Sequence, residues 1–456
     1  MHAITNLNWS VLEFIFIAII FIITLVLTYA IFPYIIRKMK EKGYVGKDIH
    51  KSERPEVAES GGLGIVIGLI IASILTMVFF PVLLNEMLVF LITISLSAFI
   101  GFVDDRVKLR SGLKIFLVVF TGAGIFLANY LNFIHIESPT IPVLGQLRLT
   151  ILYPLAVPVI VAVFANTVNM LEGYNGEGSG TCLIASVFLF ICAMIWNSAE
   201  GIILTIILIA VLIPFYKFNK YPAKIFPGDI GTLVIGSIMA CIALFGSLEV
   251  AVFCALLIHV FNSFYVISSV RGFFESSTIQ EEKNDIIMLE DDRIKASPKK
   301  DAALTLPRLI LARGPLREPD LVKRFYLISL VCGFFSIIAT LFMRWTIGTL
   351  DFIFIIIVII IFLIPTILLL YLYPRIRGIV ILMISLLTIG LIFMFFLEMV
   401  IMPQFTDTID IIFLEIPTNL LIAFIIAAPG FLIWYFITLK HFFWLIQKME
   451  KEKNGL

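Results

Sequence analysis

The sequence predicts an all-α integral membrane protein, a polytopic bundle of about 13 transmembrane helices. Of its 456 residues, 61% are hydrophobic and only 14% are charged. The mean hydropathy is +1.08. A soluble domain cannot bury that much apolar surface in its own core, so the bilayer must solvate most of it.

A helix that crosses the bilayer needs ~20 largely apolar residues. Thirteen windows of the chain fit this pattern, although the window at 201–215 is short. The windows span residues 10–33, 61–81, 87–103, 113–131, 151–168, 180–198, 201–215, 229–246, 249–270, 325–342, 352–373, 378–400 and 418–440. The first window lacks a basic start and a cleavage site of small residues, so we interpret it as an anchor and not as a cleaved signal.

The basic residues are distributed unevenly along the chain. If the N-terminus lies outside, 31 of the 33 Lys and Arg residues fall in segments placed inside, which leaves only Arg148 and Arg344 outside. Short loops on the inner side of a membrane show this bias. The sequence therefore predicts an N-terminus outside and a C-terminus inside.

Polar side chains gather in five segments, all of them predicted on the inner face. These segments are 46–62, 104–114, 166–180, 224–231 and the long loop 271–324. The middles of the apolar windows hold almost no Asp, Glu, Lys or Arg, whereas ion-coupled transporters and pumps usually carry ionisable groups at that depth. This pattern favours a protein whose substrates meet at the inner surface.

Asp104 and Asp105 follow an apolar run and begin the basic stretch DDRVKLRSGLK. A single Asp at this place would be explained as a solvated helix end. Two adjacent carboxylates repel each other unless a cation or a proton lies between them. Acidic groups beside basic ones suit a site that handles phosphate together with a divalent metal.

The segment NTVNMLEGYNGEGSG (166–180) places Asn166 and Asn169 three residues apart, on one face of a helix. The glycines that follow lead into the next span, and backbone N–H groups at a helix start can bind an anion. The alternative is a simple turn between helices. Two asparagines favour a hard cation, because such ions prefer oxygen ligands.

In the segment KIFPGDIG (224–231), Asp229 opens a span after Pro227 and Gly228. Helix capping alone would explain this Asp, and Phe226 fits an interfacial aromatic belt. Asp229 is, however, predicted on the same membrane face as the other two clusters, and the three clusters together predict a metal site. None of the five histidines lies in these three clusters, which favours magnesium over zinc. The five cysteines all fall in apolar windows without a CxxC pair, so we expect neither disulfides nor zinc.

In this order, the motifs resemble those of the polyprenyl-phosphate N-acetylhexosamine-1-phosphate transferases. The segments GFVDDRVKLRSGLK, NTVNMLEGYNGEGSG, FPGDIG, GKDIHK and PEVAESGG are most similar to the eukaryotic branch, the UDP-GlcNAc:dolichyl-phosphate GlcNAc-1-phosphate transferases. The likeness covers roughly residues 10–343. It implies a transferase membrane domain in 1–343 with cytoplasmic active-site loops, and additional transmembrane helices in 344–456.

The resemblance also implies roles for individual residues. Asp104 and Asp105 would position or deprotonate the lipid phosphate. Asn169 and Asp229 would hold Mg²⁺, with Mn²⁺ as the alternative ion. Other positions would contact the substrates. Lys114 would bind the phosphates, and the nucleotide would be contacted by Glu59, Gly173, Asn175 and Phe226. The segment Lys47, Asp48 and Ile49 is a weaker match to a nucleotide contact, and Asn166 is a further substrate-binding candidate beside Asn169.

The sequence departs from the family pattern at two places. Lys108 stands where the family commonly has an asparagine after the Asp pair. The short Arg- or His-rich motif that the family carries in its last long cytoplasmic loop is not found in 271–324. Arg271, Arg293 and Arg308 are the candidates to replace it at the sugar and the pyrophosphate.

The predicted function is transfer of GlcNAc-1-phosphate from UDP-GlcNAc to a dolichyl-type polyprenyl phosphate, with release of UMP. This would be the first membrane step in protein N-glycosylation or in assembly of a cell-surface polymer. One alternative is an enzyme of the same family that uses another UDP-N-acetylhexosamine or undecaprenyl phosphate. Two alternatives from other classes are a lipid or solute transporter and a catalytically silent scaffold of the same fold. The predicted partners are these substrates and the membrane, not nucleic acid. A homodimer is left open, because apolar helix surfaces look alike whether they face lipid or a partner.

Overall fold

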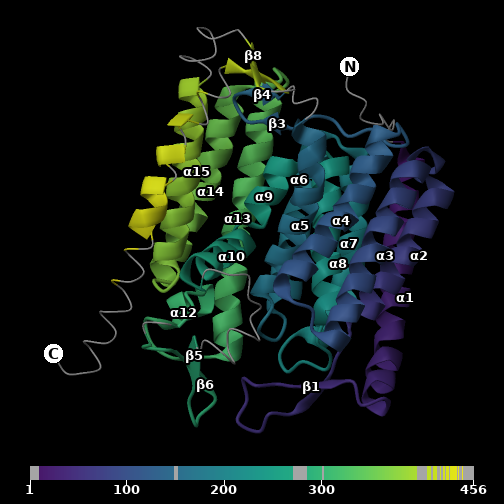
Figure 1. Ribbon diagram of the computed structural model, residues 1–456, viewed down its shortest axis with the longest axis vertical. Helices are drawn as coiled ribbons and strands as arrows, with labels where there is room; N and C mark the ends of the chain where they lie inside the picture. Colours follow the sequence, from purple (N-terminus) through teal and green to yellow (C-terminus); the bar gives the residue numbers. More distant parts are fainter. Residues whose placement is uncertain are drawn as a thin grey trace.

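The computed structural model describes residues 10–147, 152–270, 285–299 and 302–397, together with parts of 408–444. Long helices run side by side through the molecule and form one bundle, with short strands at its two ends (Figure 1). The predicted class, an all-α polytopic membrane protein, is confirmed. Helices dominate because a backbone inside lipid must satisfy its own hydrogen bonds.

The helices are α1 (Val11–Glu41), α2 (Gly62–Phe79), the 3-10 helix η1 (Pro81–Leu83), α3 (Leu84–Val107), α4 (Ser111–Tyr130), α5 (Leu152–Leu171), α6 (Glu177–Trp196), α7 (Ala199–Asn219), α8 (Gly228–Phe245), α9 (Glu249–Ala255), α10 (Leu257–Val270), α12 (Leu306–Leu311), α13 (Glu318–Thr346), α14 (Phe352–Leu372) and α15 (Arg377–Phe396). The strands are β1 (Val45–Lys47), β2 (Glu56–Ala58), β3 (Thr140–Ile141), β4 (Gly145–Gln146), β5 (Ile286–Met288), β6 (Arg293–Ala296), β7 (Leu316–Arg317), β8 (Thr408–Ile411) and β9 (Leu414–Pro417). All strand pairs are antiparallel: β1 with β2, β3 with β4, β5 with β6 and β6 with β7, and β8 with β9.

Within the described residues, 11 helices are long and apolar enough to cross a membrane, or up to 12 if a bent pair counts as one span. The bent pair is α9 and α10, which meet at 70° within the single predicted window 249–270. The short window at 201–215 becomes the 21-residue helix α7, because the helix continues past Pro214 to Asn219. The last predicted window, 418–440, lies largely outside the described residues. The count of 13 and the orientation of the termini therefore stay predictions.

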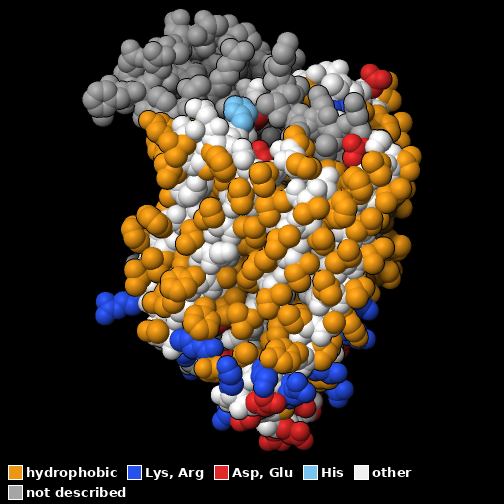
Figure 2. All heavy atoms as spheres, turned by 90° about the vertical axis from the view of Figure 1, so that its right-hand side faces the viewer, with side chains coloured by type: hydrophobic (Ala, Val, Ile, Leu, Met, Phe, Trp, Pro, Cys, Tyr) orange, Lys and Arg blue, Asp and Glu red, His pale blue; other side chains and the backbone are white. Residues whose placement is uncertain are grey.

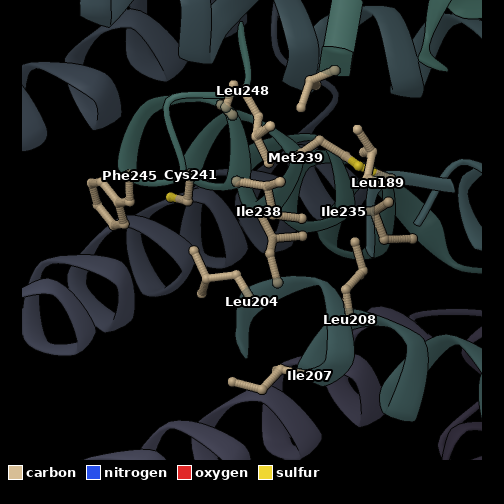
Figure 3. Close-up of a cluster of buried hydrophobic side chains, with 14 of the residues drawn as sticks. Leu189, Leu204, Ile207, Leu208, Ile235, Ile238, Met239, Cys241, Phe245 and Leu248 are labelled. Atoms are coloured by element: carbon tan, nitrogen blue, oxygen red, sulfur yellow. The ribbon is translucent and has the colours of Figure 1, made fainter. Parts of the chain in front are cut away.

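Helix α8 forms the centre of the bundle. Its apolar window is 89% buried inside the protein, and it packs against α2, α3, α5, α7 and α9. Figure 3 shows part of this core, where side chains of α8 face those of α6 and α7. The labelled residues are Leu189, Leu204, Ile207, Leu208, Ile235, Ile238, Met239, Cys241, Phe245 and Leu248. The core thus places the N-terminus of α8, which carries Asp229, inside a ring of other helices.

Glycines let the backbones around α8 touch each other. A Cβ atom on Gly62 of α2 would lie 2.2 Å from the amide nitrogen of Gly231, and one on Gly101 of α3 would lie 2.5 Å from that of Ile230. Deeper in the bundle, a Cβ on Gly236 would lie 2.4 Å from the Cα of Ala165 in α5. Small residues at membrane helix interfaces allow this close packing.

The two ends of the bundle differ in charge. Figure 2, which views the α1 and α2 side, shows a broad apolar band with Lys and Arg side chains gathered below it. Strands β1, β5 and β6 lie at this lower end, whereas β3, β4 and β8 lie at the upper end (Figure 1). The structure thus has the asymmetry that the sequence predicts, with the basic end as the predicted inner side.

Helices α14 and α15 extend the bundle beside α13 (Figure 1). The rings of Phe334 in α13 and Phe362 in α14 stack with centroids 4.4 Å apart, and Trp345 lies 5.9 Å from Phe395 of α15. The predicted boundary between 1–343 and 344–456 falls within the last turn of α13. The division into two domains stays a prediction.

The contact between α8 and α5 predicts opposite effects for two Gly→Ala substitutions. Gly236→Ala should destabilise the protein by about 1–3 kcal/mol, because its new methyl group would force two backbones apart. Gly124→Ala in α4 is the matched control: a Cβ there has no neighbour within 4 Å. It should stabilise the helix by about 0.5–1 kcal/mol. Thermal unfolding in detergent, followed with a thiol-reactive dye that reports exposure of the five buried cysteines, checks both. Equal melting temperatures for the two variants would contradict the close contact.

Candidate active site

A cavity of about 640 Å³ lies at the lower, basic end of the bundle. Its size falls in the range of small-molecule sites. The residues that line it come from the β1–β2 loop, the end of α3, the end of α5 with the turn after it, and the start of α8. They are Gly46, Lys47, Asp48, Ile49, His50, Arg54, Glu59, Asp104, Asp105, Lys108, Leu109, Ser111, Asn169, Glu172, Gly173, Tyr174, Asn175, Phe226, Pro227, Gly228, Asp229 and Thr232.

Two polar segments that are far apart in sequence are joined by backbone hydrogen bonds. The amide of Phe226 donates to the carbonyl of Ala58 at 2.8 Å, and the amide of Gly61 donates to the carbonyl of Phe226 at 2.8 Å. The amide of Gly62 likewise donates to Pro227 at 2.8 Å. This pairing brings Glu59 and Phe226 together at the cavity, and their role as nucleotide contacts stays a prediction.

Lys114 lies beneath the cavity and joins two of the predicted aspartates. Its Nζ is 2.5 Å from Asp104 Oδ2 and 2.8 Å from Asp229 Oδ1, and its side chain is only 3% exposed. Asp104 Oδ1 accepts a further hydrogen bond from the amide of Leu109 at 2.6 Å. A buried ammonium group needs such partners, since an unpaired charge at this depth would be costly. Lys114 itself does not line the cavity.

Asp105 has a different environment from its neighbour. Its Oδ1 accepts the amide of Asp229 at 2.7 Å, at the start of α8. Its Oδ2 is buried and accepts no hydrogen bond from the described residues. Gly228 adopts φ +64, and a Cβ atom there would lie 2.6 Å from Asp105 Oδ2. Only glycine therefore fits in front of this carboxylate oxygen.

The two asparagines of the 166–180 segment differ in position. Asn169 lines the cavity, and its Oδ1 accepts a hydrogen bond from Thr232 Oγ1 of α8 at 2.6 Å. Asn166 does not line it, and its Nδ2 donates to the carbonyl of Ala162, one turn back in α5, at 2.8 Å. The sequence identified the helix face, whereas the structure places only Asn169 at the cavity wall.

The glycine-rich turn after α5 is closed by its own carboxylates. Glu177 Oε2 accepts the amides of Gly173 at 3.1 Å and Tyr174 at 3.2 Å. Glu172 Oε2 accepts the amide of Gly178 at 2.8 Å. The amides of Gly173, Tyr174 and Gly178, which the sequence suggested for anion binding, thus already have acceptors within the turn.

Asn175 ties this turn to two other parts of the chain. Its amide donates to Glu318 Oε1 of α13 at 2.7 Å, and its Nδ2 donates to Asp48 Oδ2 at 2.9 Å. The ring of His50 stacks on Tyr174 with centroids 4.3 Å apart. Asp48, His50 and Glu318 could by spacing hold a cation. Because Asp48 and Glu318 already accept hydrogen bonds from Asn175, we interpret this cluster as a structural clamp.

Of the three candidate arginines, the two that the structure describes, Arg293 and Arg308, do not line the cavity. Arg308 is buried, and its guanidinium donates to the carbonyls of Ser297, Lys299, Ala302 and Ala303. It stabilises the loop before α12. Arg293 is exposed on strand β6 and pairs with Asp291 at 2.5 Å. Arg271 lies outside the described residues.

Several cavity residues were not identified from the sequence. Arg54 was not singled out, and Lys108 was noted only as a departure from the family pattern. Together with Lys47, they are the Lys and Arg residues that line the cavity in the described part of the chain. Glu172 and Thr232 also line it. Thr232 follows Asp229 by three residues on α8, a spacing that predicts the same helix face. The sequence contains no comparable signal for Arg54, because its place depends on the course of the β1–β2 loop.

The residues present fit a divalent cation. Carboxylate and amide oxygens of Asp105, Asp229 and Asn169 lie at one wall, and hard cations choose oxygen ligands. The buried Oδ2 of Asp105 is an acceptor without a hydrogen bond from the described residues, and it could ligate the ion. The wall also carries Asp48, Glu59 and Asp104. A phosphate-bearing ligand would enter such an acidic cavity only with its charge offset.

Comparisons with known proteins agree with this geometry. A family model described as "Glycosyl transferase family 4" matches residues 87–247. A "Putative UDP-N-acetylglucosamine--dolichyl-phosphate N-acetylglucosaminephosphotransferase" of Sulfolobus acidocaldarius is 34% identical over 243 residues, 51% of this chain and 71% of that protein. A "Putative glycosyltransferase" of Methanocaldococcus jannaschii is 29% identical over 322 residues, 70% of this chain and 95% of that protein. A "Phospho-N-acetylmuramoyl-pentapeptide-transferase" of Latilactobacillus sakei is 28% identical over 221 residues, 47% of this chain and 69% of that protein.

Fold and cavity together define a multi-pass membrane enzyme that transfers a phosphate-linked sugar. The chain belongs to glycosyl transferase family 4, the polyprenyl-phosphate hexosamine-1-phosphate transferases, and this confirms the resemblance found in the sequence. Members of this family generally use a divalent metal, which agrees with the oxygen ligands at the cavity wall.

The environment of Glu172 predicts a pH-dependent stability. Burial raises the pKa of its carboxyl from 4.5 to about 8, although the amide of Gly178 opposes the shift. The folded protein therefore keeps a proton that the unfolded chain releases, so the free energy of unfolding falls as the pH rises between these values. Glu172→Gln removes the titrating group. Its melting temperature relative to wild type should rise steadily from about pH 5 to about pH 9, over the range that the two pKa values define. A difference that stays constant with pH would show that Glu172 does not titrate there.

Proposed function

We propose that the protein transfers GlcNAc-1-phosphate from UDP-GlcNAc to a polyprenyl phosphate of the dolichyl type and releases UMP. One observation carries the proposal: a single cavity at the boundary of the apolar band gathers the aspartate pair, Asn169, Asp229 and the Phe226 segment. A lipid phosphate and a water-soluble nucleotide-sugar would have to meet at such a boundary. The relative from Sulfolobus acidocaldarius, whose name specifies this reaction, supports the choice of substrates.

In the proposed reaction, an oxygen of the lipid phosphate attacks the β-phosphorus of UDP-GlcNAc. The bond from that phosphorus to the oxygen of the α-phosphate breaks, and UMP leaves with that oxygen. Asn169, Asp229 and Asp105 would hold Mg²⁺, with Mn²⁺ as the alternative, and the ion would offset the charge on the diphosphate. Lys108 and Arg54 are placed at the wall to bind phosphate oxygens.

The two aspartates of the pair would have different roles. Asp104 has one oxygen on Lys114 and the other on the amide of Leu109. This arrangement favours a positioning role for Asp104 over removal of a proton from the acceptor. Asp105 has one buried oxygen without a hydrogen bond and is the better candidate to act directly at the phosphates.

The donor would bind between the segments that the backbone pairing brings together. Phe226 would stack on the uracil ring, and Gly173 and Asn175 would form the turn beside the uridine. Glu59, Lys47, Asp48 and Ile49 line the same cavity and would complete the nucleotide side. We place this face in the cytoplasm, because the Lys and Arg side chains gather at the cavity end of the bundle (Figure 2).

A second donor is supported by a specific observation. The relative from Latilactobacillus sakei is named for transfer of phospho-N-acetylmuramoyl-pentapeptide. UDP-MurNAc-pentapeptide with undecaprenyl phosphate is therefore the alternative substrate pair.

A donor panel tests the proposal. Purified protein is incubated with dolichyl or undecaprenyl phosphate and with UDP-GlcNAc, UDP-GalNAc or UDP-MurNAc-pentapeptide, with and without Mg²⁺. UMP release and mass spectrometry of the lipid product are measured. We expect a GlcNAc-diphosphate lipid that forms only with the metal. A product formed from UDP-MurNAc-pentapeptide alone would replace the proposed donor, and UMP release without any lipid product would refute the transfer.

Loss of an oxygen ligand should abolish turnover. Asp229→Asn and Asn169→Ala should each lower kcat by at least about 100-fold, as is typical for groups that stabilise developing charge. Membrane insertion and the melting temperature should show whether each variant folds. Asp351→Asn is the matched control, because Asp351 is exposed before α14, at the end of α13 away from the cavity. Rates near wild type for the first two variants would remove these residues from the metal site.

Phe226→Ala should act mainly on donor binding. Stacking on a base contributes about 1–3 kcal/mol, so KM for the nucleotide-sugar should rise about tenfold or more while kcat changes little. Phe226→Trp keeps an aromatic face and should restore KM. If both variants leave KM at the wild-type value, Phe226 is a packing residue and the uridine pocket lies elsewhere.

A further inference from the structure

The turn between α14 and α15 lies against the start of α13 and the segment after α12, at the cavity end of the bundle (Figure 1). Two arginines hold it there. Arg313 Nη1 donates to the carbonyl of Pro374 at 2.8 Å, and Arg375 Nη1 donates to the carbonyl of Gly314 at 2.6 Å. These reciprocal bonds bring two guanidinium groups to the turn between the apolar helices α14 and α15.

A third guanidinium reaches the same turn from α13. Arg324 lies 4.8 Å from the ring centroid of Tyr373, and its Nε is buried without a hydrogen-bond partner among the described residues. Lys323 lies 6.0 Å from the same ring centroid. We call Arg313, Arg324 and Arg375 the arginine cluster.

The arginine cluster has no acidic partner in the part of the chain that the structure describes. None of its three side chains has a carboxylate of the described residues within 4.0 Å. Burial and the nearby charges of Arg324 and Arg313 lower the pKa of Arg375. Like charges that are held together in this way repel each other, so an anion between them would relieve the repulsion.

The unused donors suit a phosphate group. Each guanidinium carries five N–H groups in a planar fork that matches phosphate oxygens. Arg313 and Arg375 each use one nitrogen to hold the turn, which leaves their other N–H groups for an anion. The Nε of Arg324 is buried, so this residue would offer its terminal nitrogens. Three forks at one place can therefore bind several oxygens of the same group.

The surroundings indicate that the phosphate belongs to a lipid. The apolar windows of α14 and α15 are only 11% and 17% buried inside the protein, so their side chains are exposed on both sides of the turn. In a bilayer these surfaces would contact acyl chains directly beside the guanidinium groups. A headgroup at the interface would reach the arginine cluster while its chains cover these helices.

We propose that the arginine cluster binds the phosphate of an anionic membrane lipid and so fixes α14 and α15 against the segment between α12 and α13. This site is separate from the cavity, and it does not depend on which sugar or polyprenol the enzyme uses. No residue of the arginine cluster lines the cavity.

Native mass spectrometry of the full-length protein in detergent tests the proposal. Phosphatidylglycerol and phosphatidylcholine are added at equal concentration, and the bound lipids are counted. Wild type should retain phosphatidylglycerol preferentially. Arg324→Gln and Arg375→Gln should each weaken its binding by about tenfold or more, as expected for loss of a charge-assisted hydrogen bond. Arg324→Lys keeps the charge without the planar fork and should bind more weakly than wild type but more tightly than Arg324→Gln.

Arg37→Gln is the matched control. Arg37 is exposed on α1 near the cavity end and tests general attraction of the basic end to anionic lipid. It should bind phosphatidylglycerol like wild type, and the melting temperature of each variant shows that it is folded. An equal loss in Arg37→Gln and Arg324→Gln would overturn the proposal, as would wild-type binding in all cluster variants. Displacement of the lipid by millimolar inorganic phosphate would show a site for the free ion and would also overturn it.

Discussion

The site depends on direct contact between backbones at the N-terminus of α8. Gly62 of α2 and Gly101 of α3 leave no room for a side chain there, so three helices meet with only main-chain atoms between them. This contact lets Asp105 reach the amide of Asp229 and lets the Gly61–Gly62 segment pair with Phe226 and Pro227. Side chains at these glycines would separate the walls of the cavity. Packing in the apolar layer therefore determines the geometry of the polar one.

The electrostatics of the cavity follow from how its carboxylates are used. Glu172 and Glu177 accept the amides of their own turn, and Asp104 is held by Lys114. These groups keep the wall rigid, but they leave few donors for an anionic ligand. A diphosphate would therefore depend on a divalent ion and on the basic residues Lys47, Arg54 and Lys108. The architecture suits a reaction between two anions, in which charge must be offset at the moment they approach.

Much of this architecture could be predicted from hydropathy and motif order, because both are local properties of the chain. The apolar windows marked the spans, and the aspartate pair and Asp229 lie at one cavity. The bend between α9 and α10 could not be predicted, since the residues around it, 250–258, are all apolar and include no Pro or Gly. Arg308 and Asn166 carried the right chemistry, but their donors are used by carbonyls of the folded chain. Arg54 was missed because only the folded β1–β2 loop brings it to the wall.

The clamp around Asn175 joins residues that lie far apart in the sequence, so the ribosome synthesises them at different times. Asp48 precedes α2 in the sequence, whereas Glu318 comes only at the start of α13. A second contact has the same property: Asp292, which follows α10, accepts a hydrogen bond from the amide of Ser52 at 2.8 Å. Helices of a growing chain can enter the bilayer and pack one after another. The turn that carries Asn175, however, gains its last partner only at the start of α13. A chain that stops after α10 would hold the aspartate pair, Asn169 and Asp229 in the membrane and still lack the carboxylate that supports Asn175. Assembly itself would therefore delay the appearance of a finished site until the ribosome has made the start of α13.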